Sequence, residues 1–116
     1  MTDSLRDLAL QLERFAQDRE WQPFHSPKNL ASALVVEAGE LLEHFQWLTE
    51  AQSREVSAEK RDAIGAEIAD VLLYLVQLSS SLDIDPIAAA QEKLRANAIK
   101  YPVDKARGNS KKYDEL

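Results

Sequence analysis

The sequence predicts an all-α protein, and three observations support this fold class. The 116 residues include only 3 glycines and 4 prolines, too few for the many tight turns of a β-sandwich or β-barrel. Aromatic residues, which are enriched in strands, make up 7% of the chain. Apolar residues instead recur at spacings of three and four, which is the period of an amphipathic helix. A chain of this length holds one hydrophobic core, so we expect one domain of four helices.

The first helix is predicted over residues 4–19. Its apolar residues fall at helical spacings and therefore share one face, which we expect to be buried. These residues are Leu5, Leu8, Ala9, Leu12, Phe15 and Ala16. Residues 21–25 then form a connector.

Ser26 and Pro27 mark the start of the second helix, because serine caps free N–H groups and proline fits the first helical position. No proline interrupts the chain from residue 28 to 85, and we expect this helix to reach about Thr49. The polar residues 50–57 form the next connector. Ser57 caps a third helix that is predicted to reach about Leu82.

Asp85 and Pro86 repeat the cap-and-proline pattern and begin the fourth helix. Tyr101 should end it, because a residue that precedes a proline disfavours helical backbone. The chain thus divides into a helical domain over residues 1–102 and a basic tail over residues 103–116. We expect the tail to be ordered only where it docks.

The formal net charge of −6 disfavours a protein that grips a nucleic acid polymer. The basic residues are unevenly distributed, since seven of the fourteen lie in residues 93–112, beside the single acid Asp104. An acidic body with a basic tail can hold a metal and an anion together.

The chain has no cysteine, which excludes disulfides, thiolate zinc sites and cysteine nucleophiles. The N-terminus lacks a basic segment followed by an apolar run, and no stretch approaches the roughly 20 apolar residues that span a bilayer. We therefore expect a soluble cytoplasmic protein without a membrane partner.

Two matched pairs of carboxylates lie on the second and third predicted helices: Glu37 with Glu40, and Glu67 with Asp70. Residues three apart share a helix face, so each helix presents one pair. The pairs border the apolar stripes, since Glu37 lies about 40° around the helix from Leu41. If the two helices pack antiparallel, the four carboxylates converge.

Four converging carboxylates repel one another, and a divalent cation relieves the repulsion. Oxygen ligands without cysteine favour magnesium or manganese, and magnesium often shares its ligands with substrate phosphates. A diiron site is an alternative, but it needs Glu-x-x-His pairs, and His44 stands at the wrong offset from Glu40. For either pair alone, a solvated acidic surface is also a sufficient explanation.

Aromatic residues extend both carboxylate faces. His44 and Trp47 continue the face of the first pair, and Tyr74 continues that of the second. Trp47 lies roughly 10 Å along the predicted helix from Glu40, which suits the separation of a triphosphate from its base. A tryptophan at this place either stacks on a nucleobase or packs in the core.

Two further groups have both a binding and a structural explanation. Trp21, Phe24 and His25 form either a pocket wall or a hydrophobic staple before the second helix. A polar face of the fourth helix suits phosphate oxygens or solvent and consists of Lys93, Asn97, Lys100 and Tyr101. The isolated glycines cannot form a phosphate-binding loop, and the serines at 79–81 have no histidine within helical reach, which disfavours covalent catalysis.

These motifs, in this order, resemble the MazG-like, all-α nucleoside triphosphate pyrophosphohydrolases, and within them the dCTP pyrophosphatase branch. The resemblance runs from about Trp21 to Leu116. It is carried by Trp21-x-x-Phe24-His25-x-Pro27-x-Asn29-Leu30, Glu37-x-x-Glu40, Phe45-Gln46-Trp47, Glu67-x-x-Asp70-x-x-x-Tyr74, Asn97-x-x-Lys100-Tyr101-Pro102 and Arg107-Gly108-x-Ser110-x-Lys112-Tyr113.

The resemblance implies a four-helix bundle that assembles as a dimer of dimers, with active sites built from more than one subunit. It implies hydrolysis of a deoxynucleoside triphosphate, such as dCTP or a modified dCTP, to the monophosphate and pyrophosphate with magnesium. The implied metal ligands are Glu37, Glu40, Glu67 and Asp70, with Glu37 or Glu40 activating the water. Trp21, His25, Trp47 and Tyr74 would line the base and sugar pocket, and Lys93, Asn97, Lys100 and Tyr101 would face the phosphates or the pocket edge. The tail would cover the site or remain in solvent.

Two alternatives stay open at this point. One is a non-catalytic helical oligomerisation or interaction module, whose acids serve only solubility. The other is an enzyme of the same fold that acts on another base or a modified cytosine. In each case the apolar stripe of the third helix is too wide for one neighbour in the same chain, so we expect a homo-oligomer, and by resemblance a homotetramer.

Overall fold

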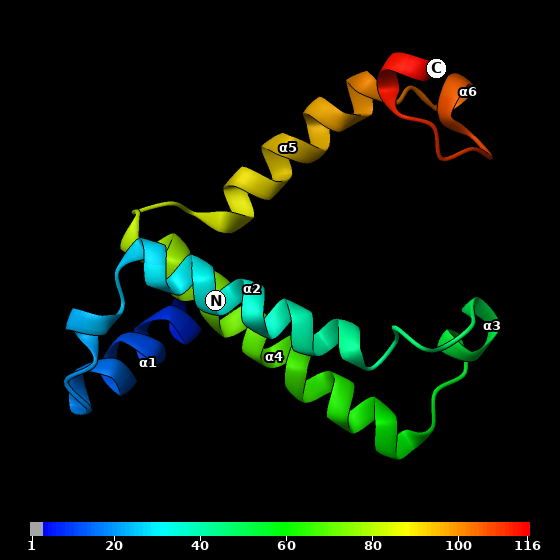
Figure 1. The fold of residues 1–116 in the computed structure, drawn as a ribbon. Coiled ribbons are helices and arrows are strands. Elements are labelled where there is room, and N and C mark those ends of the chain that lie inside the picture. The colour runs from blue at the N-terminus through cyan, green and yellow to red at the C-terminus, as the bar shows by residue number, and fades with distance from the viewer. Residues whose placement is uncertain (1–3) are drawn as a thin grey trace. The chain divides into compact units, whose positions relative to one another are not determined.

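The computed structural model describes residues 4–116, and its regular elements are all helices (Figure 1). This confirms the predicted all-α class. The α-helices are α1 (Ser4–Asp18), α2 (Pro27–Glu43), α3 (Glu50–Ser53), α4 (Ala58–Ser81), α5 (Pro86–Lys100) and α6 (Val103–Ala106), and the short 3-10 helices are η1 (Gln22–Phe24) and η2 (Tyr113–Glu115).

The predicted helix starts are confirmed by their caps. Ser26 accepts a hydrogen bond from the backbone N–H of Asn29 at 3.2 Å, and Ser57 accepts one from the N–H of Lys60 at 3.1 Å. At the start of α5 one carboxylate oxygen of Asp85 accepts two backbone N–H bonds. Each cap occupies a donor that the first helical turn leaves without a partner.

The predicted end of the second helix at Thr49 was wrong, because α2 ends at Glu43 and a turn follows. Thr49 has extended backbone and begins α3 instead. Its side chain accepts a bond from the Gln52 N–H at 3.1 Å, and its own N–H donates to the Gln52 side chain at 2.9 Å. This capping box starts a new helix and so excludes Thr49 from α2. It also places Trp47 in the turn, off the helix face that Glu37 and Glu40 share.

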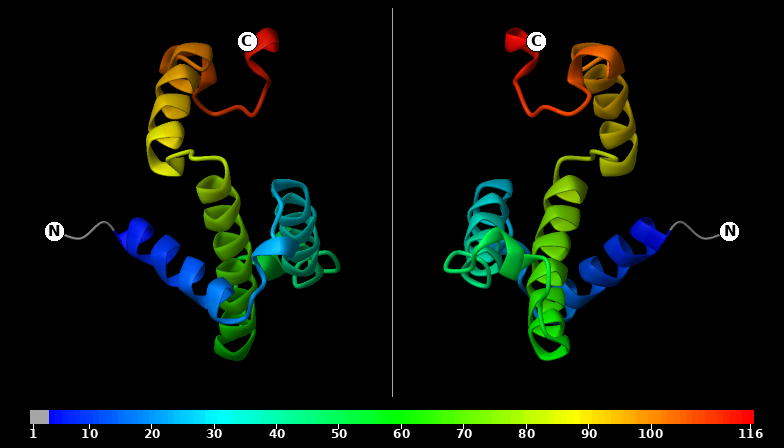
Figure 2. Two further views of the ribbon diagram at one scale, coloured as in Figure 1. Left: turned by 90° about the vertical axis from the view of Figure 1, so that its left-hand side faces the viewer. Right: turned by 90° about the vertical axis from the view of Figure 1, so that its right-hand side faces the viewer.

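The chain forms two compact units, one that ends at Asp83 and one that begins at Ile84. In the first unit α4 lies between α1 and α2 and runs antiparallel to α2 (Figures 1 and 2). Its buried apolar core is small and consists of Ala16, Leu30, Ile64 and Val76. Three of the four long predicted helices therefore belong to this unit, and the fourth, α5, belongs to the second.

Large apolar side chains of the first unit remain exposed. Val35 and Val36 on α2, and Ile68, Leu72 and Leu75 on α4, are all accessible in the single chain. Among the described residues α4 is also the one helix whose length and composition are enough to cross a membrane. Large apolar side chains left exposed in this number are typical of a binding surface.

The second unit joins the tail to the end of α5. The ring of Tyr113 packs edge to face on that of Tyr101, with centroids 6.3 Å apart. The Lys100 ammonium nitrogen lies 4.9 Å from the centroid of the Tyr113 ring, a cation–π contact. Residues of the tail thus make ordered contacts within their own unit.

Candidate active site

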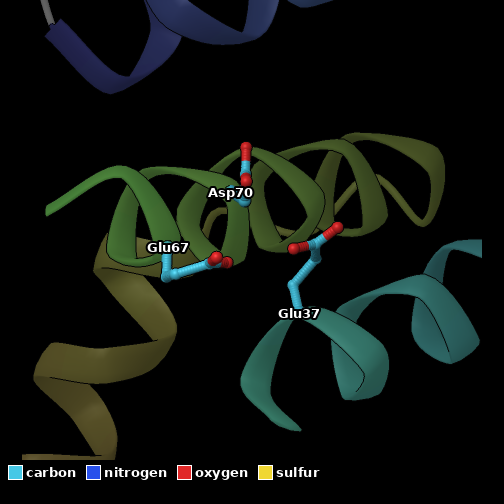
Figure 3. Close-up of side chains that lie close together, drawn as sticks. All are labelled: Glu37, Glu67 and Asp70. Atoms are coloured by element: carbon cyan, nitrogen blue, oxygen red, sulfur yellow. The ribbon is translucent and has the colours of Figure 1, made fainter. Parts of the chain in front are cut away.

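Three carboxylates from two helices meet at the α2–α4 interface. Glu37 extends from α2 toward Glu67 and Asp70 of α4 (Figure 3). One oxygen of each carboxylate lies within 4.8 Å of the others. The antiparallel packing brings together acids that are thirty residues apart, and the three-residue spacing keeps Glu67 and Asp70 on one face.

Glu40 is not one of the three acids whose carboxylate oxygens meet, but it acts on two of them. A hydrogen bond with the Glu40 carboxyl group, followed by burial and by repulsion from Glu40, Asp70 and Glu67, raises the pKa of Glu37 to about 7. Burial, followed by repulsion from Glu40, raises the pKa of Glu67, while the charge of His44 acts in the opposite direction. Three of the four acids thus meet, and Glu40 influences the pKa of Glu37 and of Glu67.

The cluster fits a hard divalent cation. Oε2 of Glu37 and Oε2 of Glu67 are shielded from solvent, and neither accepts a hydrogen bond. Buried carboxylate oxygens normally have hydrogen-bond or metal partners, because their desolvation is otherwise unfavourable. A set made only of carboxylate oxygens matches the preferences of magnesium and manganese.

A pocket of about 370 Å³ adjoins the carboxylate cluster in the first unit. Asp70 belongs to both the cluster and the pocket wall, and Tyr74 follows it one helical turn later. Trp21 and His25 line the pocket from the α1–α2 connector. The remaining lining residues are Leu8, Gln11, Leu12 and Phe15 of α1, and Leu73 and Gln77 of α4. The pocket is thus largely aromatic and aliphatic, with one acidic edge.

The connector holds its aromatic residues through local bonds. The Trp21 N–H donates to the Ala16 carbonyl at 2.9 Å, directly after Glu20, whose positive φ of 53° reverses the chain. The Trp21 ring packs edge to face against Phe15 at 5.7 Å and against His25 at 6.1 Å. These contacts hold Trp21 and His25 at the pocket wall, which they share with Tyr74 and Asp70.

The other predicted binding residues are not among those that line this pocket. Trp47 is 86% exposed and is not among its lining residues. Lys93, Asn97 and Lys100 of α5, and Tyr101, which follows the last residue of α5, belong to the second unit. A role for these five residues in binding stays a prediction.

Sequence reasoning missed two kinds of pocket residue. Leu12 and Phe15 belong to the predicted apolar face of the first helix, and both line the pocket. Gln77 lies seven residues after Asp70 and three after Tyr74, on the same face of α4. That spacing was the available signal, and a lone glutamine in a helix is too common to attract attention.

Comparison with known proteins assigns the family. The sequence pattern of the MazG-like family matches residues 33–116 of this chain, which is most of its length. The chain belongs to the MazG-like family.

Individual relatives of this MazG-like protein agree with the assignment. Human dCTP pyrophosphatase 1 is 41% identical over 115 residues, which cover 97% of this chain and 68% of the human protein. The rat protein of the same name is 39% identical over the same shares. A pyrophosphatase from Archaeoglobus fulgidus has a similar structure, with a TM-score of 0.82 and 38% identity over 88% of this chain and 95% of its own. The resemblance to MazG-like pyrophosphohydrolases that the motifs indicated is confirmed.

Proposed function

We propose that this MazG-like protein hydrolyses a deoxynucleoside triphosphate, dCTP or a modified dCTP, to the monophosphate and pyrophosphate. The observation that carries the proposal is Asp70, which belongs both to the carboxylate cluster and to the aromatic pocket. A ligand that contacts both parts needs an anionic end bound through a cation and a flat apolar end. A nucleoside triphosphate has this form, and the relatives named dCTP pyrophosphatase 1 support a cytosine base.

Glu37, Glu40, Glu67 and Asp70 are the residues that would hold Mg²⁺, with Mn²⁺ as a substitute. When bound, the cation neutralises charge on the phosphate oxygens. Oε2 of Glu37 and of Glu67 have no other partner, which supports a ligand role for both side chains.

One of the two acids on α2 would orient the attacking water and take its proton. Glu37 is one candidate, because its carboxylate lies in the cluster with those of Glu67 and Asp70. Glu40, which shares a hydrogen bond with Glu37, is the other candidate. The water oxygen bonds to the α-phosphorus, the bond from that phosphorus to the bridging oxygen breaks, and pyrophosphate leaves.

The base and sugar would lie in the pocket that Trp21, His25 and Tyr74 line. An aromatic wall stacks on a base through its π face, and polar groups at the base edge provide the choice between bases. Trp47 and the α5 residues Lys93, Asn97, Lys100 and Tyr101 complete the site in this proposal. The separation into a domain over residues 1–102 and a tail over residues 103–116 that covers the site also stays a prediction.

The exposed apolar residues of α2 and α4 support an assembly, for which we propose a homotetramer in the cytoplasm. A second copy of the chain offers the same apolar side chains and so covers them without exposing new ones. Insertion into a membrane is disfavoured by Glu67 and Asp70 in the middle of α4, because carboxylates are costly in lipid. The acidic net charge of −6 likewise disfavours a nucleic acid polymer as partner.

Two variants and a nucleotide panel test the function. Glu40→Ala and Asp70→Ala should abolish pyrophosphate release while the helix content measured by circular dichroism stays unchanged. The wild-type panel should rank dCTP or a modified dCTP first. Substantial turnover by either variant contradicts the assignment of the site. If the wild type releases no pyrophosphate from any nucleotide and no nucleotide raises its melting temperature, the protein is a non-catalytic helical module.

A further inference from the structure

Gln77 has an unused hydrogen-bond acceptor beside the pocket. Its side-chain oxygen Oε1 is shielded from solvent and accepts no hydrogen bond. Nearly all buried amide oxygens in proteins have a donor, so a buried oxygen without one calls for an explanation. The proposed reaction assigns no role to this residue.

The surroundings of Gln77 leave room for its side chain to turn toward a ligand. Gln77 lines the pocket that contains Asp70 and Tyr74, and it also lines an adjacent cavity of about 300 Å³. Because Oε1 accepts no hydrogen bond within the protein, such a rotation costs no hydrogen bond to this oxygen.

The position of Gln77 on α4 matches the base end of a bound nucleotide. Asp70, Tyr74 and Gln77 follow one another at spacings of four and three residues, so they share one face of the helix. Seven residues at the helical rise place Gln77 about 10 Å along the axis from Asp70. A nucleotide whose phosphates lie at the carboxylate cluster and whose base lies along the pocket therefore brings the base edge toward Gln77.

We propose that Gln77 determines base specificity by accepting a hydrogen bond from the exocyclic amino group of cytosine. The inference rests on the proposed function and names the group that reads the base. Cytosine presents an amino donor at the position where uracil and thymine present a carbonyl acceptor, and two acceptors do not bond. Stacking on Trp21 is available to every base and cannot make this distinction.

The test is a double-mutant cycle between the protein and the substrate. On the substrate side, dCTP is compared with the deoxynucleoside triphosphate of 2-pyrimidinone, in which a hydrogen replaces the amino group of cytosine. Gln77→Met removes the amide and keeps an unbranched side chain of similar length, and Gln77→Leu provides a second apolar variant. Gln11→Leu is the matched control, because Gln11 is an amide that lines the same pocket from α1.

In the wild type and in Gln11→Leu, kcat/KM for dCTP should exceed kcat/KM for the analogue by about ten-fold. The analogue has no amino group, and leaving one buried acceptor without its donor usually has an effect of this size. In both Gln77 variants the two substrates should be used about equally. Unchanged preference for dCTP in the Gln77 variants overturns the inference and leaves the proposed function intact. Absence of pyrophosphate release from every nucleotide by the wild type overturns both.

A stability measurement separates recognition from a structural role. Replacing an unpaired buried oxygen with apolar atoms should leave the melting temperature of the ligand-free protein equal or higher. A large decrease in the melting temperature of both Gln77→Met and Gln77→Leu would indicate that the amide is bonded within the fold. This result would overturn the inference.

Discussion

Glu37 and Glu67 approach each other across the α2–α4 interface with carboxylate oxygens within 4.8 Å, and each retains one shielded oxygen that accepts no hydrogen bond (Figure 3). Two like charges at this distance destabilise the folded chain in the absence of a cation. Protonation of these acids, or a cation bound between them, should therefore stabilise the folded protein.

The stability of the metal-free protein should depend on pH through Glu37. The pKa of Glu37 is about 7 in the folded state against 4.5 as its ordinary value. Below pH 4.5 the group is protonated in both states, and between these values the folded protein retains a proton that the unfolded chain has lost. Its contribution to the free energy of unfolding therefore falls as the pH rises through 7.

Thermal unfolding from pH 5 to pH 8, with EDTA present, measures this effect. The melting temperature of Glu37→Gln should fall less over this range than that of the wild type, because the amide does not ionise. Glu43→Gln, a change at an exposed acid of the same helix, provides the control. A wild-type protein that is most stable at pH 8 without metal contradicts the prediction.

Magnesium should stabilise the protein through the same acids. A ligand that binds only the folded state adds about 2.7 kcal/mol to the free energy of unfolding at a hundredfold excess over its dissociation constant. Glu67→Gln should lose most of this gain, since it removes one of the clustered carboxylates, whereas Glu43→Gln should keep it. Calorimetric scans with a series of Mg²⁺ concentrations measure the melting temperature of both variants. Equal increases of the melting temperature with Mg²⁺ in the two variants would place the metal elsewhere.

The helix starts and the carboxylate pair on each helix could be predicted because both depend on local spacing. Ser26, Ser57 and Asp85 cap helices with their own side chains, and pairs three residues apart share a face in any helix. The end of α2 could not be predicted from apolar periodicity, because the capping box of Thr49 competes with continuation of the helix. The shielded oxygen of Gln77 depends on how α1 and α4 pack, which no pattern within one helix reveals.

The apolar surface of α4 should hold the assembly together. Ile68 is 52% exposed in the single chain, beside the acids Glu67 and Asp70. Ile68→Asp should shift the proposed homotetramer toward monomers, because it places a charge on a surface that must be desolvated. Light scattering at micromolar concentration measures the mass. Ser32→Asp, a new charge at an exposed polar position of α2, should keep the wild-type mass. A wild-type protein that is itself a monomer would exclude a site shared between subunits.

Trp21 and Trp47 should differ in how they affect nucleotide binding. Trp21 lines the pocket within one chain, whereas Trp47 is 86% exposed. Stacking on a base contributes about 1 to 3 kcal/mol, so Trp21→Ala should raise the KM of every good substrate by about ten-fold or more. Trp47→Ala should do the same only if an assembled neighbour brings this side chain to the site.

Steady-state kinetics with several nucleotides separate stacking from selection. Both tryptophan variants should leave the ranking of substrates unchanged, since an indole stacks on all bases. His25→Ala should alter the ranking or the rate, because an imidazole can donate to or accept from the base edge. If Trp47→Ala has no effect on any KM while Trp21→Ala does, the base is held by the pocket of α1, its connector and α4, and Trp47 serves the assembly or the fold.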